Sequence, residues 1–249
     1  MLRPHYLDES GQVCYVVVNP GGAYLGADLY VLDVEVGDGA SLVLTTQSAT
    51  KIYRTPGSFA EQRMSIRLGE GAQLELAPDQ VIAYREASYR QNTHITVHPS
   101  SSLVMAEVIT PGWSPDGASF RYEELRLRNE IHVASAAGTG LLALDNLLIR
   151  PPENDVTAMG FMEGYSHLGS LVVVDARVDQ ALADELHHLA ARHDAYTGVS
   201  LSATMDGITG LVLRSLSNST EKLNTLLGGC SSLLRQRWHG KAPLNLRKY

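Results

Sequence analysis

A strand–turn–strand pattern that recurs about every 30 residues constrains the fold of this chain more than any other feature. VEVGDGASLVL and IRLGEGAQLEL are close copies of this unit, and TVHPSSSLVMAEV is a weaker third copy. The first strands of the three units end at Val36, Leu68 and Val97, and glycine or proline marks the turn that follows each of them. The pattern predicts a mainly β fold of stacked strand pairs, β-helix-like (solenoid-like) or sandwich-like. Ordinary hairpins in an antiparallel sheet are the alternative.

The pattern changes after residue 165. We therefore expect a β-rich body over residues 1–165 and an α+β region over residues 166–249 that packs on this body, either as a second part or as one continuous domain. LVVVDA at residues 171–176 indicates a buried strand, and VSLSAT and GLVLRSL indicate a hairpin across residues 205–207. Two helices are predicted, the first capped by Asp179 and the second by Asn218, with Glu221 as its capping-box partner.

Composition limits the function classes. The chain has 249 residues, 44% of them apolar, which is enough for a sizeable core. Its net charge of −7 argues against nucleic-acid and anionic-membrane partners, because both need clustered positive charge. The sequence has no apolar run of membrane-spanning length and no secretory signal pattern. Cys14 and Cys230 lie far apart and do not indicate a disulfide framework, so a cytoplasmic location is expected.

The sequence offers no catalytic constellation. NPGGAYLGAD at residues 19–28 lacks the Gly-Lys-Ser/Thr ending of a phosphate-binding loop, and neither a GxSxG elbow nor an HExxH motif occurs. His94, His98 and His132 lie in strand-like segments and are interpreted as structural, while the adjacent His187 and His188 are interpreted as surface residues. These observations favour a binding protein over an enzyme.

Two carboxylates stand out because they lie inside apolar strands. Glu107 occurs in LVMAEVIT and Asp145 in LLALDNLLI. A buried ionised carboxylate is costly unless it is paired or hydrated. One interpretation is structural, with outward-facing side chains or a buried ion pair. The other is functional, with both carboxylates lining a polar, water-filled interior where a divalent cation makes transient contact.

Several longer motifs carry a family resemblance. TTQSATKIYR at residues 45–54 is the most specific, and GGAYLGAD, APDQVIAYREASYRQ, SSSLVMAEVITPGW and GFMEGYSHLGS agree in order and spacing. Together they resemble the UreD (UreH) family of urease accessory proteins over essentially the whole chain. Within the first motif we single out five residues, Thr46, Gln47, Lys51, Tyr53 and Arg54. Ile52 and Tyr53 are interpreted as structural, whereas Lys51 and Arg54 either pair with interior carboxylates or mark a partner surface.

The resemblance implies a nickel-related function. It implies a β-helix-like body with a helical layer, partnership with UreF, with the GTPase UreG and with apo-urease, and no catalytic activity of its own. It further implies that Ni²⁺ passes transiently through an internal channel, with no tightly bound cofactor. The positions that resemble channel-lining ones are Asp28, Glu107 and Asp145, as transient metal contacts, and Thr50. The alternative is a scaffold for the maturation complex that conducts no ion.

The start of the chain departs from the family pattern. Family members usually carry a longer stretch before an RPxYL segment, which lies here at residues 3–7. If that stretch contributes strands to the β body, we expect an exposed sheet edge in this chain.

Overall fold

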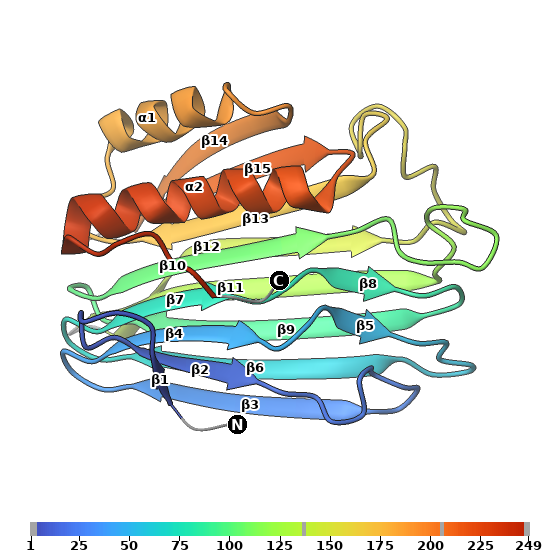
Figure 1. Ribbon diagram of the computed structural model, residues 1–249, viewed down its shortest axis with the longest axis horizontal. Helices are drawn as coiled ribbons and strands as arrows, with labels where there is room; N and C mark the ends of the chain where they lie inside the picture. The colour runs from blue at the N-terminus through green and yellow to red at the C-terminus, as the bar shows by residue number, and fades with distance from the viewer. Residues whose placement is uncertain (1–3, 136–137, 205–206, 247–249) are drawn as a thin grey trace.

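Two β-sheets lie face to face in the computed structural model, which describes residues 4–135, 138–204 and 207–246 (Figure 1). The first sheet has ten strands: β1 (His5–Tyr6), β2 (Val13–Val17), β4 (Ser41–Thr46), β5 (Thr50–Ile52), β7 (Gln73–Ala77), β8 (Val81–Ala83), β10 (Ser102–Ile109), β13 (His167–Val174), β14 (Tyr196–Ala203) and β15 (Thr209–Ser217). The second sheet has five: β3 (Leu29–Val36), β6 (Ala60–Leu68), β9 (Ser88–Val97), β11 (Glu124–Ser135) and β12 (Gly138–Ile149).

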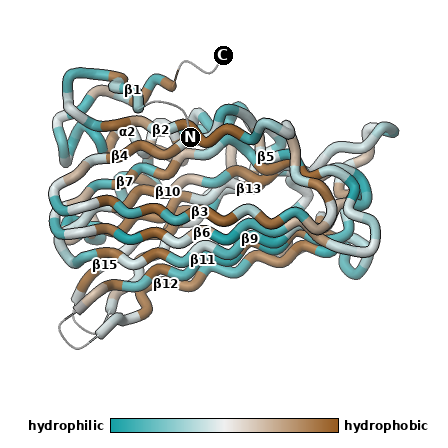
Figure 2. The backbone as a smooth tube through the Cα atoms, turned by 90° about the horizontal axis from the view of Figure 1, so that it is seen from below, coloured by the Kyte–Doolittle hydropathy of each residue, from teal (hydrophilic) through white to brown (hydrophobic). Residues whose placement is uncertain are grey.

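The chain crosses repeatedly between the two sheets in its first half, and only β1–β2, β4–β5 and β7–β8 are successive strands of one sheet there. As a result β2, β4, β7 and β10 pair in parallel in the first sheet, and β3, β6, β9 and β11 pair in parallel in the second. Figure 2 shows these strands stacked one above another. The two strands of each repeat unit belong to different sheets and are therefore not hairpins. The predicted mainly β, solenoid-like fold of stacked strand pairs is confirmed.

The predicted repeat positions coincide in space. Val36 pairs with Leu68, and Leu68 pairs with Val97. Val97 in turn pairs with Val133 on β11, which adds a fourth member to the stack. All four side chains are buried in one apolar cluster between the sheets. The period in the sequence is therefore the length of one turn of the solenoid.

The turns after β3 and β6 are also coupled to each other. Gly39 and Gly71 adopt positive φ values of 66° and 62°, which favour glycine. The Asp38 carboxylate accepts a hydrogen bond from the Glu70 backbone N–H at 2.8 Å. A Cβ atom at Gly69 would lie 2.3 Å from Asp38 Oδ1 and 2.9 Å from the Asp38 nitrogen. The close stacking of the two turns thus requires glycine at position 69.

We expect Gly69→Ala to destabilise the protein by about 1–3 kcal/mol, because the new methyl group overlaps the turn of the preceding coil. Gly37→Ala is the matched control, since a Cβ there meets no atom within 4 Å. It should be neutral or slightly stabilising. Urea unfolding measures both. Equal effects of the two substitutions would contradict this role of the stacked turns.

The C-terminal part of the chain extends the first sheet and covers it with two helices. After the antiparallel β11–β12 pair, β13, β15 and β14 continue the first sheet in antiparallel order. Helix α2 (Thr220–His239) packs on β10, β13 and β15, and helix α1 (Gln180–Ala190) packs on β14 and α2. Both faces of β13 are buried, which explains its uninterrupted apolar run. No helix within the described ranges is both long and apolar enough to cross a membrane.

The two predicted helices are confirmed, but the predicted cap of α2 by Asn218 with Glu221 as its capping-box partner is wrong. Asp179 caps α1, as expected, by accepting a hydrogen bond from the Leu182 N–H at 2.8 Å. The N-cap of α2 is Ser219 and not the predicted Asn218. The Asn218 side chain instead accepts a hydrogen bond from the Ser166 N–H at 3.0 Å and fixes the loop before β13. The predicted β14–β15 hairpin is present, with residues 205 and 206 of its turn outside the described residues.

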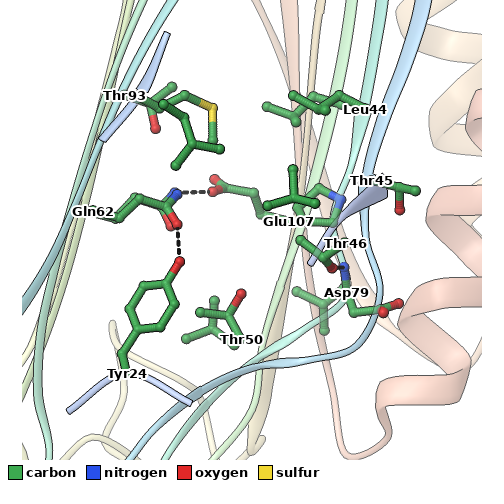
Figure 3. Close-up of a pocket in the computed structure, with 17 residues that line it drawn as sticks. Tyr24, Leu44, Thr45, Thr46, Thr50, Gln62, Asp79, Thr93 and Glu107 are labelled. Carbon is green, nitrogen blue, oxygen red and sulfur yellow. Dashed lines mark hydrogen bonds between the residues drawn. The ribbon is translucent and has the colours of Figure 1, made fainter. Parts of the chain in front are cut away.

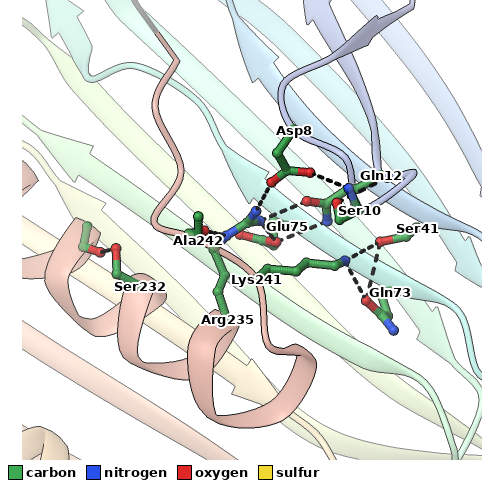
Figure 4. A network of polar contacts seen from close by, with 11 residues as sticks. Asp8, Ser10, Gln12, Ser41, Gln73, Glu75, Ser232, Arg235, Lys241 and Ala242 are labelled. Atoms are coloured by element: carbon green, nitrogen blue, oxygen red, sulfur yellow. Dashed lines mark hydrogen bonds and ion pairs between the residues drawn. The ribbon is translucent and has the colours of Figure 1, made fainter.

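A buried ionic network fastens the end of α2 to the β body (Figure 4). The Arg235 guanidinium is 3% exposed and donates to the carboxylate of Glu75 on β7. It also donates to Gln12 Oε1 and to the Ala242 carbonyl, each at 2.8 Å. The charge of Arg235 is thus both paired and hydrogen-bonded, as a buried guanidinium requires.

Candidate functional site: a polar layer between the sheets

One layer of the interior is polar, although apolar clusters lie on both sides of it. Because paired strands place equivalent positions side by side, polar residues at matching positions form continuous rows across a sheet. The second sheet contributes Gln62 paired with Gln91, and Thr93 paired with Asn129, which pairs with Asp145. The first sheet contributes Glu107 paired with Ser170, which pairs with Arg214. The flanking clusters contain Ile66, Ile95 and Ile131 on one side and Ile52, Tyr89 and Leu125 on the other.

Glu107 lies at the centre of this layer. Its Oε1 accepts a hydrogen bond from Gln91 Nε2 at 2.6 Å, and its Oε2 accepts one from Asn129 Nδ2 at 2.7 Å. Burial raises the pKa of the Glu107 carboxyl above its ordinary value, and the negative charge of Asp145 raises it further. The two amide donors and Arg214 act in the opposite direction. Glu107 is therefore a carboxylate whose charge the protein compensates only in part.

Asp145 forms an ion pair with Arg214 across the space between the sheets. The side chains are 19% and 34% exposed, so the pair is partly shielded from solvent. This arrangement corresponds to the structural interpretation of Asp145, a buried ion pair. Asp145 lies in the same layer as Glu107 but is not among the residues that line the interior cavity, so its contact with a metal ion stays a prediction.

A cavity of about 60 Å³ adjoins Glu107 between the sheets. Figure 3 shows the carboxylate pointing into this space towards Gln62, with Thr46, Thr50 and Asp79 at its border. The volume exceeds the ~10–15 Å³ that one water molecule needs. In the same layer Asn129 Oδ1 and Ser170 Oγ are buried without a hydrogen-bond partner. Water or an ion in the layer would satisfy such atoms.

Two aligned loops interrupt the first sheet beside this cavity. Pairing of β4 with β7 ends at Thr45 and Ala77, and pairing of β5 with β8 begins at Thr50 and Val81. Between these points the Thr46 hydroxyl accepts a hydrogen bond from the Asp79 N–H at 2.9 Å. The loops carry the TTQSAT and APDQ segments of the family motifs, so these motifs form the interruption of the first sheet beside the cavity.

The interior cavity shares lining residues with two pockets at the surface. Pro78, Asp79 and Glu107 line both the cavity and a groove of about 240 Å³ on the outer side of the sheet, which α2 and residues 244–246 border. Thr46 and Thr50 line both the cavity and a small pocket that contains Gln47 and Lys51. Glu107 therefore stands at a boundary between the inside and the outside of the solenoid.

The remaining predicted residues lie elsewhere. Asp28 is not among the cavity-lining residues, and its Oδ2 accepts a hydrogen bond from the Leu25 N–H at 2.8 Å within a turn. Its contact with a metal ion stays a prediction without support from this geometry. In the TKIYR segment, Ile52 is fully buried, whereas Tyr53 is 40% exposed and packs edge-on against Tyr84. Arg54 pairs at the surface with Glu86 at 2.6 Å and not with an interior carboxylate.

The fold and this layer define a class of protein: a solenoid-like shell of two sheets that encloses a carboxylate-centred polar interior. A family model described as UreD urease accessory protein matches residues 1–248. A urease accessory protein UreD from Arthrobacter sp. (strain FB24) is 84% identical over 100% of this chain and 85% of its own length. Proteins of the same description from Corynebacterium glutamicum (strain ATCC 13032) and Bacillus cereus (strain ATCC 10987) are 50% and 32% identical, over 100% and 99% of this chain and 88% of their own lengths. The chain belongs to the UreD family of urease accessory proteins, which supports a role in urease maturation.

The Asp145–Arg214 pair predicts a measurable coupling energy. Asp145→Leu should destabilise the protein by roughly 1–3 kcal/mol, below the ~3–5 kcal/mol of a fully buried pair, because both side chains keep some exposure. The double variant Asp145→Leu/Arg214→Leu should be less destabilised than the sum of the single variants. Urea unfolding of the wild type, the two single variants and the double variant measures the four free energies of unfolding. Strictly additive effects of the two substitutions would contradict the coupling.

The raised pKa of Glu107 predicts a pH-dependent effect of Glu107→Gln. The carboxyl has a folded-state pKa above its unfolded value of about 4.3. The wild-type protein therefore loses stability as pH rises between those two values, and above the folded-state pKa the loss is complete. The amide does not titrate, so the Tm of Glu107→Gln minus that of wild type should increase between about pH 4 and about pH 7.

Thermal unfolding across this pH range measures the difference. Glu123→Gln, at an exposed position, is the control and should show no such trend. A difference that decreases with pH would mean that the amide hydrogen bonds outweigh burial at Glu107.

Proposed function

We propose that this chain takes part in nickel insertion during urease maturation, and that Ni²⁺ passes through the polar layer between its sheets. In this proposal the chain assembles with UreF and with the GTPase UreG on apo-urease. The position of Glu107 supports the proposal more than any other observation. This carboxylate is largely shielded from solvent, is held by two amides, and lies in the wall that the cavity shares with the outer groove.

The chemistry of the layer suits an ion in transit. A divalent ion loses much of its hydration when it leaves water, and nearby carboxylates reduce that cost. Oxygen ligands from Glu107, Asp145 and the amides bind nickel less firmly than imidazole or thiolate. A partly hydrated Ni²⁺ could therefore occupy the layer and leave it again. Because the pKa of Glu107 is raised, arrival of the cation would also favour release of a proton from its carboxyl.

The partners would supply what this chain lacks. Its sequence has no phosphate-binding loop, so nucleotide-driven release of nickel is assigned to UreG. The outer groove and the pocket beside Gln47 and Lys51 each share lining residues with the cavity, so in this proposal they would serve as the points of entry and exit for the ion.

A scaffold without ion conduction is the second candidate, and the surface offers one observation for it. The outer face of the second sheet exposes a set of large apolar side chains, each 43% to 60% exposed: Leu29, Val31, Leu141, Leu144 and Leu148. They lie at opposite edges of this sheet, Leu29 and Val31 on β3 and the three leucines on β12, and exposed apolar side chains at either edge are a candidate protein contact. A scaffold of this type would need this surface but not the polar layer.

Substitutions in the layer separate the two candidates. Glu107→Leu and Asp145→Leu should each lower nickel-dependent urease activation roughly tenfold, the factor that corresponds to about 1.4 kcal/mol of lost stabilisation of the ion. Co-purification with UreF, UreG and apo-urease should be unchanged. Glu35→Leu on the exposed face of β3 makes the same chemical change away from the layer and should activate urease normally. Activation is expressed per amount of assembled complex, which removes any effect of stability.

Normal activation by both interior variants would exclude conduction through the layer and favour the scaffold. Loss of co-purification with the Leu144→Ser surface variant, while activation per assembled complex stays normal, would point the same way.

A further inference from the structure

Three metal-ligating side chains converge on the outer face of the second sheet. His94 lies on β9 directly opposite Glu130 on β11, because these two residues are paired in the parallel ladder. His132 follows Glu130 by two positions on the same strand and therefore projects from the same face. Among the described residues, this is the one group in which three such side chains bring their ligand atoms together, all within 4.8 Å of one another.

The distances between these groups do not correspond to good hydrogen bonds. Glu130 Oε2 lies 3.7 Å from His94 Nδ1 and 3.5 Å from His132 Nε2, beyond the ~2.7–3.2 Å of an N–H···O bond. Ligand atoms about 2.0–2.1 Å from a tetrahedral metal ion are themselves about 3.3 Å apart. The two imidazole nitrogens thus approach a single carboxylate oxygen at nearly the spacing of ligands around one ion.

Neighbouring features hold this arrangement in place. Arg128 Nη2 lies 2.5 Å from Glu130 Oε1, which leaves Oε2 directed towards the imidazoles. The imidazole rings of His94 and His132 lie with their centroids 4.7 Å apart. The regular pairing of β11 with β9 continues past Glu130 and His132, because the β-bulge opposite them has its extra residue, Leu142, on β12.

We propose that His94, Glu130 and His132 form a surface site for a divalent first-row transition metal ion such as Zn²⁺ or Ni²⁺. Two imidazoles and one carboxylate are a ligand set that such ions accept readily. The side chains of His94, Glu130 and His132 are 55%, 27% and 20% exposed, so an ion reaches them from solvent. With three protein ligands, the metal keeps at least one position for water or for a ligand from another molecule.

This site is separate from the polar layer. Successive residues of β11 point to opposite faces of the sheet, so Asn129 contacts Glu107 inside while Glu130 faces outward. The site therefore does not depend on the proposed conduction through the interior. Its imidazoles should hold a transition metal more firmly than the oxygen ligands around Glu107.

Metal titration of the full chain tests the site. Isothermal titration calorimetry with Ni²⁺ and with Zn²⁺ should show one equivalent bound with micromolar affinity. His94→Ala/His132→Ala should weaken that equivalent at least tenfold, and Glu130→Gln should weaken it measurably. Cu²⁺ as a spectroscopic probe should show nitrogen coupling in its electron paramagnetic resonance spectrum, and this coupling should be lost in the double variant.

Two controls separate this site from other histidines and from the interior. His187→Ala/His188→Ala removes two exposed imidazoles from α1 and should leave binding unchanged. Glu107→Gln should also leave it unchanged. The single variant His94→Ala, at the most exposed of the three positions, should lose affinity at least tenfold even if the double variant folds poorly. Unchanged binding in His94→Ala, or no bound equivalent in the wild-type chain at micromolar metal, would overturn the proposal.

Discussion

Parallel register between successive coils is the constraint on which the rest of this structure depends. In the second sheet β3, β6, β9 and β11 each pair in parallel with the strand one coil away, so residues about 30 positions apart stand side by side. A residue type that recurs at this spacing becomes a layer of the interior. Val36, Leu68, Val97 and Val133 make an apolar layer in this way. Gln62 and Gln91, by the same rule, contribute to a polar layer.

The polar layer is a departure from what stability alone would favour. Its amides, hydroxyls and charges lie between two apolar clusters, where each polar group needs a partner to offset its desolvation. Glu107 and Asp145 obtain such partners, but Asn129 Oδ1 and Ser170 Oγ do not. Apolar residues of similar volume would fill the same space without this cost. Retention of polar groups at such a position is most readily understood as a functional requirement.

The sequence predicted the structure correctly where a local signal was clear, such as a turn glycine that recurs with the repeat or an N-cap residue before a helix. The glycine turns and the period predicted the stacked units, and Asp179 predicted the start of α1. Glu107 and Asp145 were identified because charged residues in apolar strands are rare. Their partners Gln91, Asn129 and Arg214 were missed, because polar residues in alternating strands are ordinary and only the register shows which ones face inward. Ser219 was missed as a cap because Asn218 beside it is an equally good capping residue.

The group of His94, Glu130 and His132 on the outer face of the second sheet was missed for the same reason, because the strand register was unknown. Glu130 and His132 are two residues apart, which on a strand already places them on one face. His94 is 36 positions earlier than Glu130, and this longer coil lacks the glycine turn that marks the other repeats. The period of about 30 residues, applied to His94, leads to Glu124 and not to Glu130, so the period did not bring these two residues together. Without the register, each histidine was interpreted as structural.

The inner and outer faces of the second sheet thus carry different metal-ligand chemistry, although only the thickness of the sheet separates them. Inside, carboxylate and amide groups stand beside a small cavity, and in the proposed function their oxygens would hold a transition metal ion only weakly. Outside, two imidazoles and a carboxylate approach the spacing of a firm ligand set. Affinity and transit are opposed, because an ion that binds tightly leaves slowly. A solenoid reconciles the two requirements, since alternation along β11 assigns consecutive residues to opposite faces. In the two proposals together, Asn129 belongs to an interior suited to release of the ion, while the next residue, Glu130, belongs to a surface suited to its retention.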